Sequence, residues 1–413
     1  MQIDEPRSIR RRVGWVWLLL GLASAVGCDG KPWRAGDGGL PDAALRQDAG
    51  HSAGATGVGG DASSAGPEAS TPGDGQTVLP DAEPWLLDAG SGAPIVIFLI
   101  ADGYGAAQMD ATRMFLNGDS EPLSFEELPQ QAWVTTDNAS GAVTDSGAAA
   151  TALATGHKVG QYVLSVAIPG DGRRLPTALE IQAARGKRTG LVTTHTPITD
   201  ATPSAFGAHV GNRFDEPEVA RQLLNDSRPN VLFGLGSSNV TPTTAAAAGY
   251  AVVQSAAELE ALDPDTEYVS GQFTEATIPS LEDLALAAID LLDSSEQGFF
   301  LLVETEKSDS AGHASNLQGV IEAGVEFDAM AKAVLAWAAD RNDTLVIVGA
   351  DHETGGLVLM EDNPTAGAIP EHSYTSGGVH TGAKVRYFAR GLGAEAVAGQ
   401  LDNTDFFPLL AGL

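Results

Sequence analysis

This sequence has little cysteine and, for its length, little positive charge. The 413-residue chain contains one cysteine, Cys28, so a disulfide bond within one monomer is excluded, although an address outside the cytoplasm stays compatible with its composition. It has 23 Lys and Arg residues against 54 Asp and Glu residues, which gives a formal net charge of -31. A chain with so little positive charge is not expected to bind nucleic acid as a specific partner, because Lys and Arg bind phosphate backbones. Direct adhesion to anionic lipid is disfavoured for the same reason.

Residues 1–28 have the pattern of an export signal. Four arginines between positions 7 and 12 precede a short apolar stretch, residues 13–20, and small residues then lead to Cys28. The position of Cys28 resembles the lipidated cysteine of a bacterial lipoprotein, although Ala25 replaces the usual Leu; ordinary signal cleavage is the alternative. We expect an exported protein, periplasmic or on the cell surface, that is attached to a membrane only by an acyl group on Cys28.

The composition changes at about residue 93. Residues 29–92 are rich in Gly, Ala, Ser, Asp and Pro, so they cannot bury enough apolar surface to offset the entropy of ordering them, and we expect a disordered tether. Residues 93–413 are long enough for one large domain. Their alternating pattern, such as a helix over 177–185 followed by a strand over 189–193, predicts a three-layer α/β/α sandwich with a mostly parallel central sheet. We also expect helices over 217–225 and 281–292 and a strand over 231–233.

Three apolar runs end in acidic residues or histidines. The runs 95–100, 299–303 and 344–348 lack helical spacing and read as buried parallel strands. Because open α/β sheets bind ligands at the carboxyl ends of their strands, we expect the side chains that follow to meet at one edge. They are Asp102 after the first run, Glu304, Asp309 and His313 after the second, and Asp351 and His352 after the third.

The run from Thr144 to Ala152 places Ser146 beside Asp145 at the start of an Ala-rich helical stretch. A helix start offers unpaired N–H groups and the positive end of the helix dipole, so a phosphate held there lies within reach of the serine oxygen. The alternative is that Ser146 is an ordinary N-cap.

In residue type, order and spacing, these motifs resemble the alkaline phosphatase family over about residues 93–413. The resemblance implies that Ser146 is the phosphorylated nucleophile and that Arg213, at the end of the segment 199–213, binds the phosphate. It also implies two zinc ions and one magnesium ion. Their ligands would be Asp309, His313 and His380 for one zinc, Asp351 and His352 for the other, and Thr202 and Glu304 for magnesium. Asp102 would lie between a zinc and the magnesium, and Ser146 would be a further metal ligand.

The residue types suit these metals independently. Asp and His are good zinc ligands, whereas Asp, Glu and Thr oxygens suit magnesium. Whether cobalt replaces zinc is left open. We therefore expect metal-dependent hydrolysis of small phosphate monoesters through a phosphoserine. One departure concerns Ser310, which follows Asp309 where family members often carry His or Lys; this leaves magnesium affinity and the pH optimum open. The resemblance also leaves open whether the protein is a homodimer.

Two alternatives remain. The first is a sulfatase or a phosphodiesterase on the same fold. Sulfatases need Pro two residues and Arg four residues after the nucleophile, where this chain has Ala148 and Ala150. Arg213 suits the dianionic end of a monoester and argues against a diester. The second alternative is a non-catalytic binding lipoprotein, but loss of the chemistry should have removed at least one ligand, and none is missing.

Overall fold

The computed structural model describes residues 94–118, 120–360 and 365–412. The predicted signal segment (1–28) and tether (29–92) lie outside the described residues, so both stay predictions. Among the helices of the described part of the chain, none is both long enough and apolar enough to cross a membrane.

The domain is built on one ten-stranded sheet with the strand order β14-β2-β13-β8-β1-β7-β3-β4-β6-β5. Neighbouring strands pair in parallel except at β13, which is antiparallel to both β8 and β2. The strands are β1 (Ile95–Ala101), β2 (Gln130–Thr135), β3 (Arg188–Pro197), β4 (Val231–Leu235), β5 (Ala251–Val253), β6 (Val269–Phe273), β7 (Phe299–Thr305), β8 (Thr344–Gly349), β13 (Val385–Gly391) and β14 (Gly399–Asp402). The prediction of a mostly parallel central sheet is confirmed.

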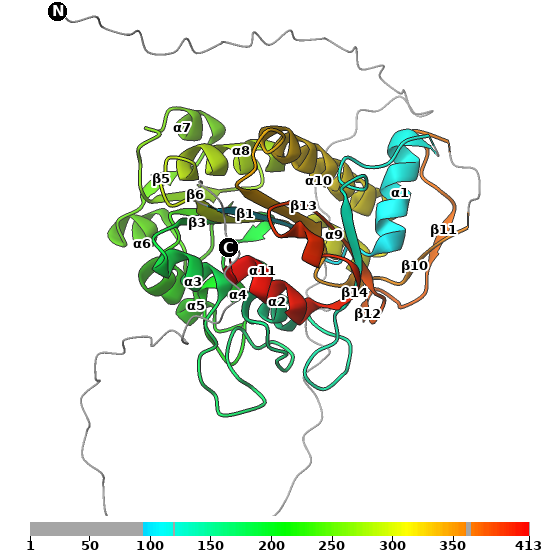
Figure 1. The fold of residues 1–413 in the computed structure, drawn as a ribbon, viewed down its shortest axis with the longest axis horizontal. Helices are drawn as coiled ribbons and strands as arrows, with labels where there is room; N and C mark the ends of the chain where they lie inside the picture. Colours follow the sequence, from blue (N-terminus) through cyan, green and yellow to red (C-terminus); the bar gives the residue numbers. More distant parts are fainter. Residues whose placement is uncertain (1–93, 119, 361–364, 413) are drawn as a thin grey trace, which may run out of the picture. The chain divides into compact units, whose positions relative to one another are not determined.

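Helices cover both faces of the sheet. Figure 1 shows α8 and α10 on one face and α2, α3, α4 and α11 on the other, so the predicted α/β/α sandwich is confirmed. The helices are α1 (Ala106–Asn117), α2 (Ser146–Thr155), α3 (Ala178–Ala184), α4 (Ala201–Gly207), α5 (Glu216–Gln222), α6 (Pro242–Ala247), α7 (Ala256–Glu260), α8 (Leu281–Leu292), α9 (Lys307–His313), α10 (Leu317–Trp337) and α11 (Phe407–Gly412).

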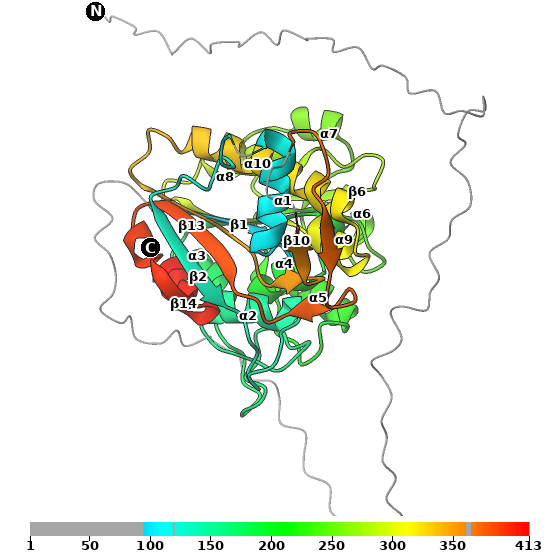
Figure 2. The ribbon, with the colours of Figure 1, turned by 90° about the vertical axis from the view of Figure 1, so that its right-hand side faces the viewer.

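Two small antiparallel pairs lie outside the main sheet. One joins β10 (Leu357–Leu359) to β11 (His372–Tyr374), and the other joins β9 (Glu353–Thr354) to β12 (His380–Thr381). Figure 2, in which the molecule is turned by 90°, shows β10 beside α1. The second pair matters for the site because each of its strands begins at or directly after a predicted metal ligand.

The central strands form where the sequence predicts them, because they are apolar on both sides. Every residue of β1, β7 and β8 is buried, as a strand covered by helices on both faces requires. The helix predicted over 281–292 is observed as α8 with the same limits. The helix predicted over 217–225 begins one residue earlier as α5 and continues as a π-helical turn over Leu223–Ser227.

Candidate active site

The carboxyl ends of β1, β7 and β8 meet at one edge of the sheet. Ile100 pairs with Glu304 on one side and with Gly349 on the other, so the residues that follow leave the sheet at the same level. The N–H of Gly103 donates to Oδ1 of Asp351 at 3.0 Å, which ties the segment after β1 to the segment after β8. The three strand ends are therefore brought together as predicted.

Position 103 requires glycine for two reasons: its backbone is left-handed, and neighbouring atoms leave no room for a side chain. Its φ is +68°, in the left-handed region that favours glycine. A Cβ atom there would lie 2.6 Å from Oδ1 of Asp309 and 2.8 Å from Oγ1 of Thr354. Any larger residue would push Asp309 away from the site.

Asp309, His313 and His380 form the first group that could hold a metal ion, with one ligand atom from each within 4.8 Å of the others. Nε2 of His313 lies 3.0 Å from Oδ2 of Asp309, and Nε2 of His380 lies 3.5 Å from Oδ1 of the same carboxylate. The two Nε2 atoms are 3.1 Å apart. These three side chains are the ones predicted for one zinc ion.

The hydrogen bonds of the two rings show that this group fits a cation. Nδ1 of His380 faces the carbonyl oxygen of Thr144 at 3.0 Å, and Nδ1 of His313 faces that of Gly378 at 2.5 Å. A carbonyl only accepts, so both Nδ1 atoms donate, and in the neutral rings the two Nε2 atoms present lone pairs. Two lone pairs 3.1 Å apart beside a carboxylate need a proton or a metal ion between them. The hydrogen bond that the His313 ring donates to Asp309 accordingly raises the pKa of His313 to about 9 when no metal neutralises the carboxylate.

Asp102, Asp309 and His352 form the second group. Nε2 of His352 lies 3.4 Å from Oδ1 of Asp102 and 3.2 Å from Oδ2 of Asp351, the predicted partner of His352 at the other zinc ion. Burial raises the pKa of both Asp102 and Asp351 well above the ordinary range, and the neighbouring carboxylates raise it further. Burial also holds the pKa of His352 well below its ordinary value, so its ring stays neutral and able to bind a metal.

The predicted magnesium ligands surround a buried carboxylate. Glu304 accepts a hydrogen bond from Oγ1 of Thr193 at 2.6 Å, and burial raises its pKa to about 7. Thr202 lies in the first turn of α4, which contacts the strand that carries Glu304. Among the buried side-chain oxygens of the described residues that have no hydrogen-bond partner, three belong to predicted metal ligands: Oγ1 of Thr202, Oδ1 of Asp102 and Oδ2 of Asp351. Buried oxygens without a donor are costly unless a cation satisfies them, so this donor set also fits a metal.

Ser146 is the first residue of α2. The N-cap is Asp145, whose side chain accepts from the N–H groups of Gly147 and Ala148, so the alternative of Ser146 as an ordinary N-cap is wrong. The serine is 5% exposed, and its Oγ lies 3.2 Å from Nε2 of His352. Its hydroxyl is therefore free of a capping role and faces the second metal group.

Arg213 lies beside the same helix start. Its Nη1 donates to Oδ2 of Asp145 at 3.2 Å and its Nη2 donates to Oδ1 of Asp200 at 2.9 Å. A Cβ atom on Gly147 would be 3.4 Å from Cδ of Arg213, so the side chain runs along the first turn of α2. Burial alone would lower the pKa of Arg213, but the charges of Asp200 and Asp145 raise it. The guanidinium is thus held in place, with its remaining N–H donors available for an anion.

Two positioning residues were missed by sequence reasoning. Asp200 caps α4 and binds Arg213, but in the sequence it looks like any acidic N-cap. Glu353 follows His352 and is buried, and its carboxylate accepts from Gln108 at 2.6 Å, from the N–H of Gly356 at 2.9 Å and from Oγ1 of Thr381. The sequence feature that could have indicated Glu353 is its acidic side chain within a segment that is otherwise buried.

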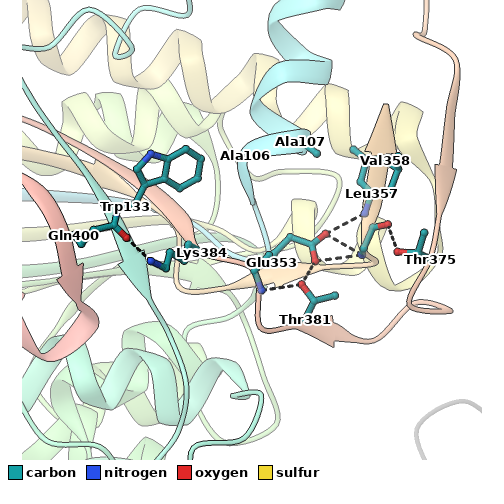
Figure 3. Close-up of a pocket in the computed structure, with 12 residues that line it drawn as sticks. Ala106, Ala107, Trp133, Glu353, Leu357, Val358, Thr375, Thr381, Lys384 and Gln400 are labelled. Carbon is teal, nitrogen blue, oxygen red and sulfur yellow. Dashed lines mark hydrogen bonds between the residues drawn. The ribbon is translucent and has the colours of Figure 1, made fainter. Parts of the chain in front are cut away.

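Glu353 also lines a groove with a volume of about 780 Å³ (Figure 3). Figure 3 shows its carboxylate directed at Thr381 and at the backbone near Leu357, with Trp133 and Lys384 on the other side of the groove. Because Glu353 holds β9 against β12, it brings the rings of His352 and His380 to a centroid separation of 3.8 Å. Glu353 therefore links the two segments that carry the candidate metal ligands His352 and His380.

The fold and this geometry define a class, namely α/β proteins that carry a serine at a helix start beside metal-binding groups at the sheet edge. Residues 93–258 and 262–372 match the family model described as alkaline phosphatase. The chain belongs to the alkaline phosphatase family, as its sequence motifs predict.

Individual relatives agree with this assignment. Alkaline phosphatase 3 of Bacillus subtilis is 33% identical over 65% of this chain, and the match spans 62% of that relative's length. The streptomycin-6-phosphate phosphatase of Streptomyces griseus is 31% identical, over 76% of this chain and 88% of its own. Among solved structures, the alkaline phosphatase of the Antarctic bacterium TAB5 superposes with a TM-score of 0.66 at 25% identity, covering 78% of this chain and 98% of that one.

Proposed function

We propose that this protein hydrolyses small phosphate monoesters through a covalent phosphoserine on Ser146 and releases inorganic phosphate. The observation that carries the proposal is the position of Ser146 as the first residue of α2, with its Oγ 3.2 Å from Nε2 of His352 and with Arg213 alongside the same turn. A nucleophile, the positive end of a helix and a guanidinium then converge on one phosphate.

Different residues of the chain bind the phosphate and carry out the reaction. Arg213 forks onto two phosphate oxygens, and its contacts with Asp145 and Asp200 orient the guanidinium before substrate arrives. The positive end of the α2 dipole lies at the same helix start. The hydroxyl of Ser146 attacks phosphorus, and the alcohol of the ester leaves from the opposite side. Water then hydrolyses the phosphoserine.

The metal complement follows from the donor sets. We propose zinc at Asp309, His313 and His380, zinc at Asp351, His352 and Ser146, and magnesium at Thr202 and Glu304, with Asp102 between the second zinc and the magnesium. When bound, these ions neutralise phosphate charge and favour the ionised form of the attacking oxygen. The orphaned buried oxygens of Asp102, Asp351 and Thr202 support this arrangement, as does the pair of facing Nε2 atoms of His313 and His380.

The other functions are less well supported. The positions two and four residues after Ser146 are Ala148 and Ala150, both buried in α2, so the residues that a sulfatase needs are absent. A non-catalytic binding protein would not need a serine hydroxyl that is left out of helix capping and lies beside His352. A diester would present one fewer charged oxygen to Arg213.

A rate comparison tests the reaction class. Purified protein loaded with zinc and magnesium would be given phenyl phosphate, bis(phenyl) phosphate and phenyl sulfate, which share one leaving group. We expect turnover of the monoester to exceed that of the other two by several orders of magnitude. A preference for the diester or the sulfate would overturn the proposal.

We also propose that the protein is exported and held at a membrane by lipidation of Cys28. The sequence pattern of residues 1–28 supports this, and burial of an acyl chain contributes ~0.8 kcal/mol per CH₂ group to membrane attachment.

A further inference from the structure

Three exposed apolar side chains are close in sequence to residues of the candidate active site. Among the described residues, the large apolar side chains that are exposed include three within three positions of a site residue: Phe214 directly follows Arg213, Val379 directly precedes His380, and Val143 precedes Ser146. Phe214 is the most exposed of them, at 63%. A large ring left in water beside a ligand-binding group marks a surface that a ligand covers.

A second aromatic ring lies against Phe214. The ring of Tyr162 has its centroid 5.5 Å from that of Phe214 with 44° between the planes. Tyr162 is half-buried and has a φ of +66°, a left-handed conformation that is costly for a bulky residue. Such strain persists only where the surroundings impose it.

The surroundings of Tyr162 are the site itself. Its N–H donates to Oδ1 of Asp145 at 2.9 Å, and its carbonyl accepts from the N–H of Arg213 at 2.6 Å. The strained residue is therefore fixed by the N-cap of the nucleophile's helix and by the phosphate-binding residue. The pair of rings, Tyr162 and Phe214, is attached to the phosphate position through these two hydrogen bonds.

Phe214 also faces the guanidinium. The Cζ atom of Arg213 lies 5.5 Å from the centroid of the Phe214 ring, within cation–π range. The ring pair thus lies next to the guanidinium that is proposed to bind the phosphate, and Phe214 is exposed to solvent there. Both rings offer flat apolar surface, which suits a planar ring better than a hydroxyl-rich sugar.

We propose that the ring pair of Tyr162 and Phe214 is a subsite for the leaving group, and that the preferred substrates are phosphate monoesters of planar aromatic alcohols. This inference rests on the proposed phosphatase function and adds the substrate class to it. The aromatic part of the substrate packs on Phe214 while Arg213 holds the phosphate.

The test measures binding with inhibitors that cannot react. Inhibition constants of phenylphosphonate, cyclohexylphosphonate and inorganic phosphate would be determined for wild type, Phe214→Leu and Phe214→Ala, with turnover of ethyl phosphate measured alongside. Phenyl and cyclohexyl groups are similar in size, but only phenyl is flat. Val358→Ala, which removes an exposed apolar side chain on β10, is the matched control.

We expect wild type to bind phenylphosphonate more tightly than cyclohexylphosphonate. Phe214→Leu should raise the inhibition constant of phenylphosphonate by about 3- to 10-fold, the scale of one lost aromatic contact. It should raise that of cyclohexylphosphonate by less than about twofold. Inorganic phosphate inhibition and ethyl phosphate turnover should change less than phenylphosphonate inhibition does in Phe214→Leu, because neither ligand carries a ring, and Val358→Ala should behave as wild type.

Equal inhibition constants of the two phosphonates in wild type, or equal losses of affinity for both in Phe214→Leu, would overturn the inference. If the protein still hydrolysed ethyl phosphate, the proposed function would stand. A metal-loaded wild type that hydrolysed neither ethyl phosphate nor phenyl phosphate would overturn the function itself, and the subsite with it.

Discussion

The Oγ atom of Ser146 lies 3.2 Å from Nε2 of His352, across 206 positions of sequence. This contact joins the start of α2 to the segment that follows β8, so the proposed nucleophile and a candidate metal-binding imidazole come from distant parts of the sequence. It forms because Asp145 takes over the capping of α2 and leaves the serine hydroxyl free. The account of the reaction depends on this relationship.

Arg213→Ala should separate phosphate binding from chemistry. The variant loses the planar fork, so we expect KM to rise and inorganic phosphate inhibition to weaken by ~10-fold or more, with a smaller fall in kcat than Ser146→Ala gives. Steady-state kinetics with phosphate as a competitive inhibitor would measure both effects. Unaltered phosphate inhibition would mean that Arg213 does not contact the substrate.

Asp200→Asn tests whether Arg213 must be held in place. The variant keeps an oxygen for Nη2 of Arg213 but removes the charge that helps to raise the pKa of the guanidinium. We expect KM to rise a few-fold with little change in thermal stability, because Asn remains a good N-cap for α4. Asp200→Ala should raise KM further. Identical kinetics in both variants and wild type would contradict a positioning role.

Metal removal should abolish activity and destabilise the fold. Without cations, the carboxylates of Asp102, Asp309 and Asp351 face one another in a buried site. We expect chelation to lower Tm and abolish turnover, and zinc or cobalt together with magnesium to restore both. Elemental analysis would be run on the same samples. A fully active protein with less than one transition metal per chain contradicts the metal assignment.

The metal-free protein should lose stability as pH rises. Burial raises the pKa of Glu304 from 4.5 to about 7, so the folded state holds a proton that the unfolded chain has released between these values. The free energy of unfolding therefore falls as pH increases from about 4.5 to about 7. Thermal melts of chelated protein across this range would show the slope, and Glu304→Gln should flatten it. If stability fell equally steeply with pH in Glu304→Gln, a group other than Glu304 would carry the proton.

Glu353→Gln should weaken zinc binding without removing a ligand. The carboxylate of Glu353 accepts several hydrogen bonds that hold β9 against β12, and an amide cannot accept all of them. Because outer residues orient metal-bound histidines, we expect zinc affinity to fall by ~10- to 100-fold. Competition with a chromogenic chelator would measure it. Gln108→Ala, which removes one donor to Glu353, is the milder comparison.

Cys28→Ala tests the membrane anchor. Wild type should fractionate with membranes and carry an acylated N-terminal cysteine by mass spectrometry, whereas the variant should be soluble. An unmodified Cys28, or wild type found wholly in the soluble fraction, would leave only ordinary secretion.

Much of the fold could be predicted from the sequence, because its central strands are apolar on both faces. Such runs mark β1, β7 and β8 without any long-range information. The antiparallel strand β13, its neighbour β2 and the edge strand β14 could not be placed, since strand order depends on pairing between residues far apart in sequence. The π-helical turn after α5 likewise leaves no clear local pattern.

The candidate site could be predicted where a residue type is itself informative. Histidines and carboxylates after buried strands indicate metal ligands, and the structure brings His313, His380 and Asp309 together. Asp200 and Glu353 were missed because their roles depend on partners elsewhere in the fold. Tyr162 was missed because its left-handed backbone is imposed by Asp145 and Arg213 and not by its own preference.

The most direct test of the central claim is to trap the phosphoenzyme. Zinc-loaded and magnesium-loaded protein would be mixed with labelled phenyl phosphate, quenched in acid, digested and sequenced by mass spectrometry, with Ser146→Ala as the control. We expect one labelled phosphate per active chain on Ser146 in wild type, and none in the variant, which should also lose most of its turnover while staying folded. Wild type that turns over substrate with no phosphate on Ser146, or an alanine variant with an unchanged rate, would contradict the covalent mechanism.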